Sequence, residues 1–218
     1  MLKSRLFFLF SILGIIALLA SACAPGATTT APVKEAGLRF LVSDEPNDIG
    51  DFEHLYVTIT SIGIHPSNGD STDNSTDNST DNNTDDGNWL KFTSDIDKVD
   101  LTTLQGKNAQ EIWSGNITVG EYNKVFIYVS DVEGVLAGAS ANETANVKLP
   151  GGKLQISKPF TVSGNNTAFV FDITVVKTGN GKYILKPQVA DSGAGKEYTE
   201  VTAQQRNQKE KNKKQGQP

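Results

Sequence analysis

The chain has 218 residues, of which 37% are hydrophobic and 21% charged, with a formal net charge of −5 and one cysteine. This length is sufficient for one domain with its own hydrophobic core. The acidic balance argues against nucleic acid as a partner, because nucleic-acid-binding proteins present a basic face to the phosphate backbone. A single cysteine excludes an internal disulfide and a cysteine cluster for a metal, so the core must be stable without either.

The N-terminus has the composition of an export signal. Lys3 and Arg5 precede an apolar run over residues 6–20, and small residues follow it. The run is shorter than the roughly 20 residues that span a bilayer, so it indicates a secretory signal peptide over residues 1–22. Cys23 ends the sequence Leu-Ala-Ser-Ala-Cys, which resembles a prokaryotic lipobox with alanine in place of the usual leucine. We therefore expect a lipid on Cys23 and export to the cell membrane or outer membrane, with an ordinary signal peptide as the alternative.

A tether and a tail flank the central part of the chain. Residues 23–36 are small and polar with two prolines, which is typical of a flexible tether. Residues 193–218 are rich in Gln, Asn and Lys and indicate a disordered basic tail, free in solution or held against an anionic surface. Without Lys3 and Arg5 the formal charge is −7, and since the residues after 195 contribute +3, the remainder carries −10.

Between tether and tail the apolar pattern has a period of two. It predicts strands over residues 38–43, 55–66, 89–92, 125–132, 148–156, 169–176 and 183–189. The change of apolar parity between Ile59 and Ile62 predicts a bulge near Ser61 or Gly63, and the glycines of Thr178–Gly181 predict a hairpin. Residues 108–113 are expected to form a short helical turn. About seven short strands without a long amphipathic helix predict a single all-β sandwich over residues 37–192.

Residues 67–88 interrupt this pattern with a low-complexity insertion in which Asp-Asn-Ser-Thr repeats. The insertion has no apolar residue, so it has nothing to bury that would offset the entropy of ordering. Its acids offer oxygen ligands of the type that calcium prefers, but the glycine and final glutamate of an EF-hand are missing. We favour a solvated loop over a calcium site that would use Asp73, Asp77, Asp81, Asp85 and Asp86.

A second acidic cluster lies between the first two predicted strands, at the rim of the sandwich. Loops on a rigid scaffold often carry binding residues, so this loop is a candidate calcium site. The cluster consists of Asp44, Glu45, Asp48, Asp51 and Glu53, and all of these except Glu45 are the candidate ligands. The alternative, which we favour, is that these acids are present for their turn chemistry. No organic cofactor is expected, and calcium is the candidate ion.

Six Asn-x-Ser/Thr sequons are glycosylation candidates if the host modifies exported proteins. Three of them arise from the repeat, and the other three are Asn116, Asn142 and Asn165.

The sequence offers little support for catalysis. Its two histidines, His54 and His65, lie in a strand pattern, and neither a zinc-protease helix, a serine nucleophile elbow nor a phosphate loop is present. We therefore expect no enzyme activity. Most aromatic residues have apolar neighbours at strand spacing and are expected in the core. Trp113, followed by Ser-Gly-Asn, is expected to be partly exposed and is the candidate contact for a sugar ring.

The order of several short motifs resembles a known family, the domain of unknown function numbered 4382, over residues 37–191. The motifs are Gly37 with Ser43-Asp44-Glu45-Pro46, Asp51, Val57-Thr58-Ile59, Val99-Asp100-Leu101 with Leu104, Val119-Gly120-Glu121-Tyr122, Asp172 and Leu185-Lys186-Pro187. Glu45 replaces a small residue that is more typical before the proline, and the insertion is extra. The resemblance implies a β-sandwich of transthyretin or immunoglobulin-like character, found in exported prokaryotic lipoproteins, and it supplies no catalytic residues.

Together these patterns predict a lipid-anchored extracytoplasmic module that has a binding or structural role and no catalytic activity. The expected partners are the membrane, through the lipid, and a surface polysaccharide or an envelope protein. The alternatives are a calcium-stabilised structural or adhesion domain and, more distantly, an envelope hydrolase with an unrecognised site. The sequence leaves the ligand and the oligomeric state open.

Overall fold

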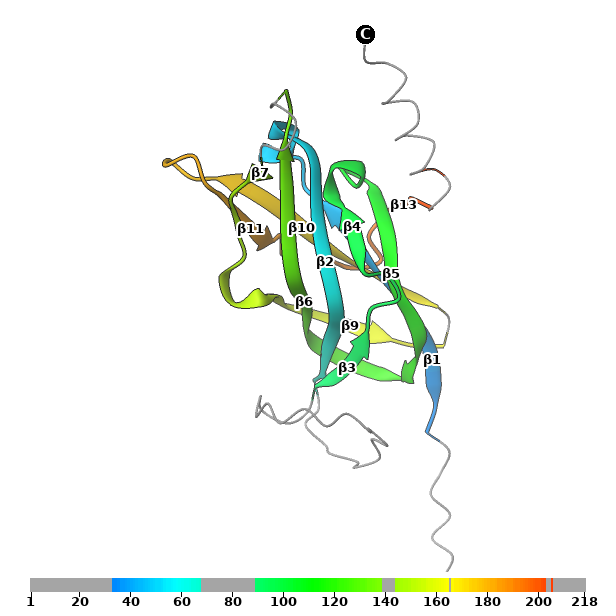
Figure 1. The fold of residues 1–218 in the computed structure, drawn as a ribbon. Helices are drawn as coiled ribbons and strands as arrows, with labels where there is room; N and C mark the ends of the chain where they lie inside the picture. Colours follow the sequence, from blue (N-terminus) through cyan, green and yellow to red (C-terminus); the bar gives the residue numbers. More distant parts are fainter. Residues whose placement is uncertain (1–32, 68–88, 139–143, 165, 203–204, 206–218) are drawn as a thin grey trace, which may run out of the picture. The chain divides into compact units, whose positions relative to one another are not determined.

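Alternating apolar and polar residues build two β-sheets in this protein (Figure 1). The computed structural model describes residues 33–67, 89–138, 144–164, 166–202 and 205. Apart from Val33, these belong to a unit that begins at Lys34. The predicted signal peptide, most of the tether and insertion, and the end of the tail lie outside the described residues. Within the described part, no helix is long and apolar enough to cross a bilayer.

Sheet A has seven strands in the order β13-β5-β1-β10-β11-β8, with β12 pairing with β10. Its strands are β1 (Glu35–Asp44), β5 (Asn108–Thr118), β8 (Val147–Lys148), β10 (Thr167–Lys177), β11 (Tyr183–Pro187), β12 (Gly193–Ala194) and β13 (Thr199–Glu200). The first strand, β1, runs parallel to β10 and antiparallel to β5. This places the end of β1 beside the middle of β10, where Ser43 is in register with Asp172.

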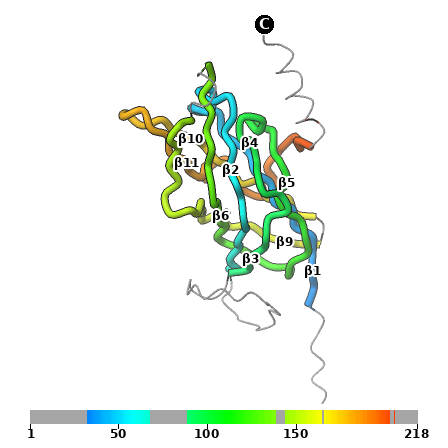
Figure 2. The backbone as a smooth tube through the Cα atoms, in the orientation of Figure 1, coloured from blue at the N-terminus to red at the C-terminus, as the bar shows by residue number. Residues whose placement is uncertain are grey.

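Sheet B has six strands, with the long strands β2 and β6 paired at its centre (Figures 1 and 2). Its strands are β2 (Phe52–Pro66), β3 (Leu90–Thr93), β4 (Lys98–Asp100), β6 (Gly120–Leu136), β7 (Thr144–Ala145) and β9 (Lys153–Val162). The register of β2 against β6 shifts between Thr58 and Ser61, so the predicted bulge is confirmed. Three 3₁₀ turns join strands of the described residues: η1 (Asp48–Asp51), η2 (Leu101–Thr103) and η3 (Pro150–Gly152).

The core lies between the two sheets and is formed by alternate residues of their strands. On β1 and β10 the inward residues include Phe40 and Phe169, whose rings stack with centroids 5.2 Å apart. On β6 they include Val125 and Ile127, both fully buried. The predicted all-β sandwich is confirmed, because a period of two places every second side chain of a strand on the same face.

Two predicted elements are wrong. Residues 108–113 form the start of β5 instead of a helical turn. The register of β1 and β5 shifts between Phe40 and Leu41, and this bulge lets Ile112 and its neighbour Trp113 both face the core, which disturbs the period of two. Residues 148–156 do not form one strand, because η3 separates β8 in sheet A from β9 in sheet B.

The described structure also continues beyond residue 192, where the predicted domain ended. The strands β12 and β13 return along sheet A and pair with β10 and β5. Tyr198 packs on the outer side of sheet A against Leu41 and Val170. Arg39 donates a hydrogen bond to the Tyr198 hydroxyl at 3.1 Å and also pairs with Glu200 at 2.6 Å. This return adds short strands to the seven or so that the sequence predicts.

Candidate functional site

The end of β1 carries an acid that faces the core. Asp44 follows the inward positions of Phe40 and Val42 at a spacing of two, and its side chain is fully buried. Both of its carboxyl oxygens lack a hydrogen-bond partner. Burial, followed by the charges of Asp172 and Glu45, raises the pKa of Asp44 to about 8. The group is therefore mostly protonated at neutral pH, which is the form that tolerates an apolar environment.

The other predicted calcium ligands lie along η1 and the start of β2, and two of them contact one lysine. Asp48 accepts a hydrogen bond from the Lys177 backbone amide at 2.6 Å, and Asp51 pairs with the Lys177 ammonium at 2.7 Å. The hydroxyl of Tyr183 also donates to Asp51 at 2.7 Å. These two contacts lower the pKa of Asp51. Glu53 is half-buried at the start of β2.

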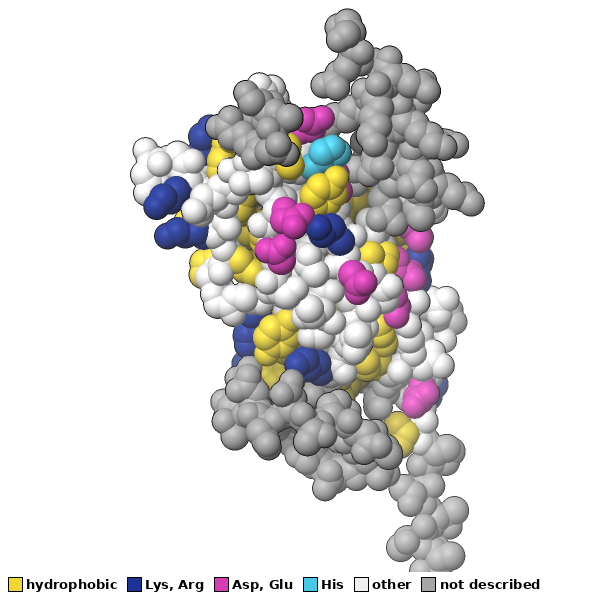
Figure 3. All heavy atoms as spheres, viewed as in Figure 1, with side chains coloured by type: hydrophobic (Ala, Val, Ile, Leu, Met, Phe, Trp, Pro, Cys, Tyr) yellow, Lys and Arg dark blue, Asp and Glu magenta, His cyan; other side chains and the backbone are white. Residues whose placement is uncertain are grey.

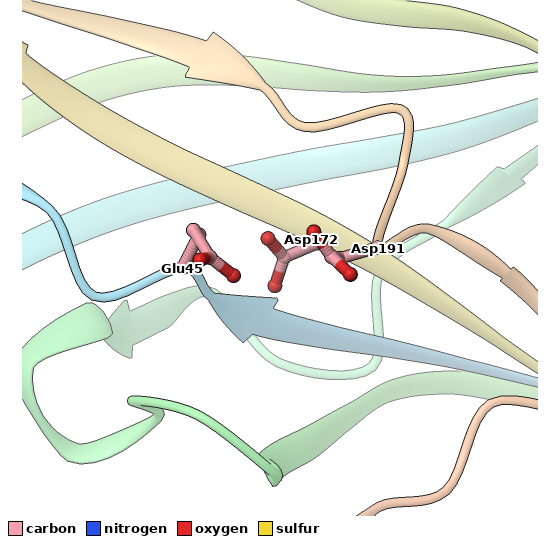
Figure 4. A group of neighbouring side chains, drawn as sticks. All are labelled: Glu45, Asp172 and Asp191. Carbon is pink, nitrogen blue, oxygen red and sulfur yellow. The ribbon is translucent and has the colours of Figure 1, made fainter.

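A different set of three acids comes together on the outer side of sheet A (Figure 4). Across the described residues, the carboxylates of Glu45, Asp172 and Asp191 bring ligand oxygens within 4.8 Å of one another. The three come from separate segments: the residue after β1, the middle of β10, and the connection from β11 to β12. On β10, Asp172 alternates with Phe171 and Ile173, which belong to the core, so its side chain points to the opposite face.

The polar contacts of Asp172 leave one carboxyl oxygen unpaired. The Ser43 hydroxyl donates a hydrogen bond to Oδ1. The other oxygen, Oδ2, has no partner. Water does not reach it either, because Asp172 is only 3% exposed. Buried polar atoms in folded proteins nearly always have a partner, so this oxygen requires an explanation.

The connection from β11 to β12, residues 188–192, is fixed to the backbone of Asp172. The amide of Gln188 donates to the Asp172 carbonyl at 2.8 Å. The amide of Asp172 donates to the Ser192 hydroxyl at 2.9 Å, and this hydroxyl donates to the Gln188 carbonyl at 2.7 Å. These bonds hold Asp191 beside β10 and place its carboxylate near the other two.

The three acids have an ammonium, that of Lys196, beside them. Burial raises the pKa of Asp172 to about 6; the Ser43 hydrogen bond opposes this rise, and the charges of Glu45 and Asp191 add to it. The Lys196 ammonium lies 3.8 Å from Asp191 and donates to the Ala190 carbonyl at 2.9 Å, and its charge lowers the pKa of Asp172. A group of carboxylate and hydroxyl oxygens without sulfur or imidazole suits a hard divalent cation.

A second feature is a set of rings in edge-on and tilted contact on the outer side of sheet B, which we call the aromatic face. It consists of His65, Trp89, Phe126 and Tyr128 with Lys91 and Lys153. The ring of Phe126 lies 4.6 Å from both Trp89 and Tyr128, and Trp89 lies 5.2 Å from His65. In Figure 3, hydrophobic and lysine side chains lie next to each other over the region of β3 and β6.

The two lysines of the aromatic face cover its rings. The Lys91 ammonium lies 4.8 Å from the centre of the Tyr128 ring, and that of Lys153 lies 5.3 Å from the centre of Phe126. Cation–π attraction at such distances contributes about 0.5–1 kcal/mol at an exposed site. Gly63 makes room for this arrangement, because a Cβ atom there would lie 1.9 Å from Phe126 Cζ.

Comparison with known proteins identifies the family. The chain matches the family described as Domain of unknown function (DUF4382) over residues 35–187. The chain belongs to this family. No curated protein and no solved structure matches it. The matched DUF4382 region includes Glu45, Asp172 and the whole aromatic face, whereas Asp191 follows it by four residues.

The expectation that Trp113 is partly exposed is wrong for this DUF4382 domain. Its side chain is 9% exposed and its ring stacks on Phe92 with centroids 4.3 Å apart. A Cβ atom at Gly115 would lie 2.6 Å from the indole, so the glycine after Ser114 provides space for the ring instead of exposing it. The bulge in β5 is what directs Trp113 inward.

The remaining predicted site residues are dispersed. Asn116 is exposed on β5, and Asn142, Asn165 and Cys23 lie outside the described residues. His54 stands 2.8 Å from Asp100, whose other carboxyl oxygen accepts from the Leu55 and Thr102 amides. This arrangement joins β2 to η2.

Sequence reasoning missed the grouping of the three acids. Glu45 was part of the predicted acidic loop but was not among its proposed ligands. For Asp172 a signal was available, because it is the one charged residue in the run from Phe169 to Val176, which is apolar apart from Asp172 and Thr174. A charge in a strand of this kind needs a partner and therefore marks a position of interest. For Asp191 we find no such signal.

Proposed function

We propose that this DUF4382 protein is a lipid-anchored, extracytoplasmic, non-catalytic module that binds an anionic surface polysaccharide through the aromatic face. The observation that carries the proposal is the row of rings on sheet B with ammonium groups over it. Trp89 and Tyr128 are half-buried and offer a flat apolar surface to the C–H faces of sugars, with a polar edge for their hydroxyl groups. Phe126 is 2% exposed and packs against both rings without being available to a ligand itself. The ammonium groups of Lys91 and Lys153 would attract uronate or phosphate groups on the same polymer.

The N-terminal sequence supports the location of the module. A basic start, a short apolar run and Cys23 at its end are the features that direct lipid attachment to an exported chain. A polar stretch of residues 24–34 would then separate the lipid from the first strand, β1, and allow the sandwich to reach a polymer beyond the bilayer.

Cys23 provides the test of anchoring. Changing Cys23→Ser should move the protein from the membrane fraction to the soluble fraction, and mass spectrometry of the N-terminal peptide should show an acyl modification on the unchanged chain alone. An unmodified Cys23 peptide in membranes of the native host would refute the lipid anchor.

Binding to the polymer is tested with two matched aromatic–lysine pairs. The purified full chain is titrated with an anionic wall polysaccharide and with a neutral storage glucan. Tyr128→Ala should weaken binding of the anionic polymer by about 3–10-fold, since an aromatic contact contributes about 0.5–1.5 kcal/mol. Tyr56→Ala is the matched control, because Tyr56 is also half-buried on sheet B, with the Lys98 ammonium 5.2 Å from its ring.

Equal effects of the two tyrosine substitutions would contradict the aromatic face as the binding site. Binding to neither polysaccharide, together with capture of one envelope protein that Tyr128→Ala abolishes, would replace the polymer by a protein partner. Turnover of a glycan or ester by the purified chain would replace the binding module by a hydrolase.

A further inference from the structure

We propose that Glu45, Asp172 and Asp191 bind a calcium ion that fastens the connection between β11 and β12 to the outer side of sheet A. This site is separate from the aromatic face, and the proposal does not depend on polysaccharide binding. It also differs from the calcium site that the sequence suggests, of whose ligands Asp48 and Asp51 contact Lys177.

The spacing of the three carboxylates fits one calcium ion. Calcium–oxygen distances are about 2.3–2.6 Å, so ligand oxygens on opposite sides of the ion stand about 5 Å apart and others stand closer. The ligand oxygens of Glu45, Asp172 and Asp191 all lie within 4.8 Å of one another. Figure 4 shows the three side chains approaching one another from β1, from β10 and from the connection that precedes β12.

The unpaired oxygen of Asp172 is the independent sign that something binds here. Asp172 is only 3% exposed, and no hydrogen-bond donor contacts its Oδ2 atom. Leaving a buried carboxyl oxygen without a partner is costly, and a bound ion is one of the partners that can satisfy such an atom. A divalent cation would supply the missing contact and would add to the single positive charge of Lys196, whose ammonium lies 3.8 Å from Asp191.

The chemistry of the ligands selects calcium among common divalent ions. The group contains carboxylates and, next to them, the hydroxyls of Ser43 and Ser192, but neither histidine nor cysteine. Zinc and copper prefer nitrogen and sulfur, and magnesium requires a regular octahedron with several waters. Calcium accepts irregular oxygen sites, and extracellular modules bind it with Kd of about 10⁻⁴–10⁻³ M.

Three segments distant in the sequence would be joined by the ion. Glu45 follows β1, Asp172 belongs to β10, and Asp191 lies on the connection that leads to β12 and β13. In the absence of the ion, this connection is attached near Asp172 by hydrogen bonds of Gln188 and Ser192. The ion would therefore lower the rate at which the connection opens.

The test is a calcium titration of the purified full chain at neutral pH. At calcium concentrations of about 100 times Kd, we expect Tm to rise by about 5–10 °C relative to chelator, and calorimetry to show one site. Asp191→Asn should abolish both signals and leave Tm in chelator unchanged, because Asp191 is exposed. Asp131→Asn removes an exposed acid on sheet B and is the matched control that should respond as the unchanged chain does.

Asp172→Asn separates a calcium ligand from a structural residue. Asparagine keeps an acceptor for the Ser43 hydroxyl and removes the negative charge, so Tm in chelator should be equal to or above that of the unchanged chain. The response to calcium should nevertheless be lost. Hydrogen exchange should show that calcium protects the Ser192 amide in the unchanged chain but not in Asp191→Asn.

Three results would overturn the proposal. The first is an unchanged Tm and no heat of binding with CaCl₂ up to 10 mM, roughly ten times the upper Kd of such modules. The second is a calcium response that survives in Asp191→Asn but is lost in Asp48→Asn, which would place the ion in the loop before β2. The third is an equal response to MgCl₂, which would contradict the assignment of calcium.

Discussion

Replacing Asp44 with asparagine should stabilise the folded protein far more at pH 8 than at pH 5. Asp44 is fully buried, and neither of its carboxyl oxygens has a hydrogen-bond partner. Its backbone is fixed to the segment after η2, since its amide donates to the Leu104 carbonyl at 3.0 Å and its carbonyl accepts from the Gly106 amide at 3.1 Å. The side chain therefore has little freedom to reach water.

The sign and magnitude follow from the pKa. Burial raises the pKa of Asp44 to about 8 in the folded state, whereas an unfolded aspartate ionises near 4. Between these values the unfolded state has released a proton that the folded state keeps. The free energy of unfolding consequently falls by about 1.4 kcal/mol per pH unit as pH rises from 4 to 8. Asparagine has no such proton. The free energy of unfolding of Asp44→Asn should therefore rise relative to that of the unchanged chain by roughly 3–4 kcal/mol between pH 5 and pH 8.

The assay is urea denaturation of both proteins in chelator at pH 5, 6, 7 and 8, followed by tryptophan fluorescence. The informative quantity is how the difference in the free energy of unfolding between the two proteins changes with pH. Its absolute value is less informative, because the unsatisfied amide of asparagine costs about 1–3 kcal/mol at every pH. Asp172, whose pKa is raised to about 6, is present in both proteins, so its contribution to the pH dependence largely cancels. Asp97→Asn removes an exposed acid and is the control substitution. Parallel curves for Asp44→Asn and the unchanged chain would refute the reasoning.

Two further predictions concern the core and the aromatic face. Ile127→Asp should prevent folding, because it places a charge at a fully buried position. The control Ser130→Asp, at an exposed position of the same strand, should fold. A cooperative melt of soluble Ile127→Asp would show that this core assignment is wrong. Gly63→Val should displace the Phe126 ring and destabilise the fold by about 1–3 kcal/mol, while Gly120→Val, where a Cβ atom meets nothing within 4 Å, should cost less in the same denaturation assay. Equal losses for the two glycines would contradict the close approach of Phe126.

The three polar residues before the proline in the opening motif of the DUF4382 domain have different positions in the fold. In Ser43-Asp44-Glu45-Pro46 the serine contacts Asp172, Asp44 enters the core, and Glu45 approaches Asp191. Successive residues of a strand point to opposite faces, so this short motif contributes to both sides of sheet A. Turn chemistry alone, which the sequence favours, does not account for these three positions.

The strands themselves were predictable from local patterns. Most predicted strands appear with longer bounds, the bulge near Ser61 is present, and the hairpin at Thr178–Gly181 joins β10 to β11 with Gly181 at φ 75°. Each of these features depends on side-chain alternation or on the conformation of a few adjacent residues. The errors at residues 108–113 and 148–156 arise where a bulge or a pair of glycines disturbs that alternation.

The sequence by itself determined the all-β class, the family and most of the apolar residues that face the core, because the period of two of a strand is visible in any short stretch of sequence. It did not place Trp113 or Asp44 in the core. Only the tertiary structure decided which polar residues meet. Ser43 and Asp172 are 129 positions apart and become neighbours through the parallel pairing of β1 with β10. Asp191 joins them because the chain returns along sheet A to form β12. Such pairing depends on how whole strands pack and on which sheet each one enters, and no local period encodes that choice.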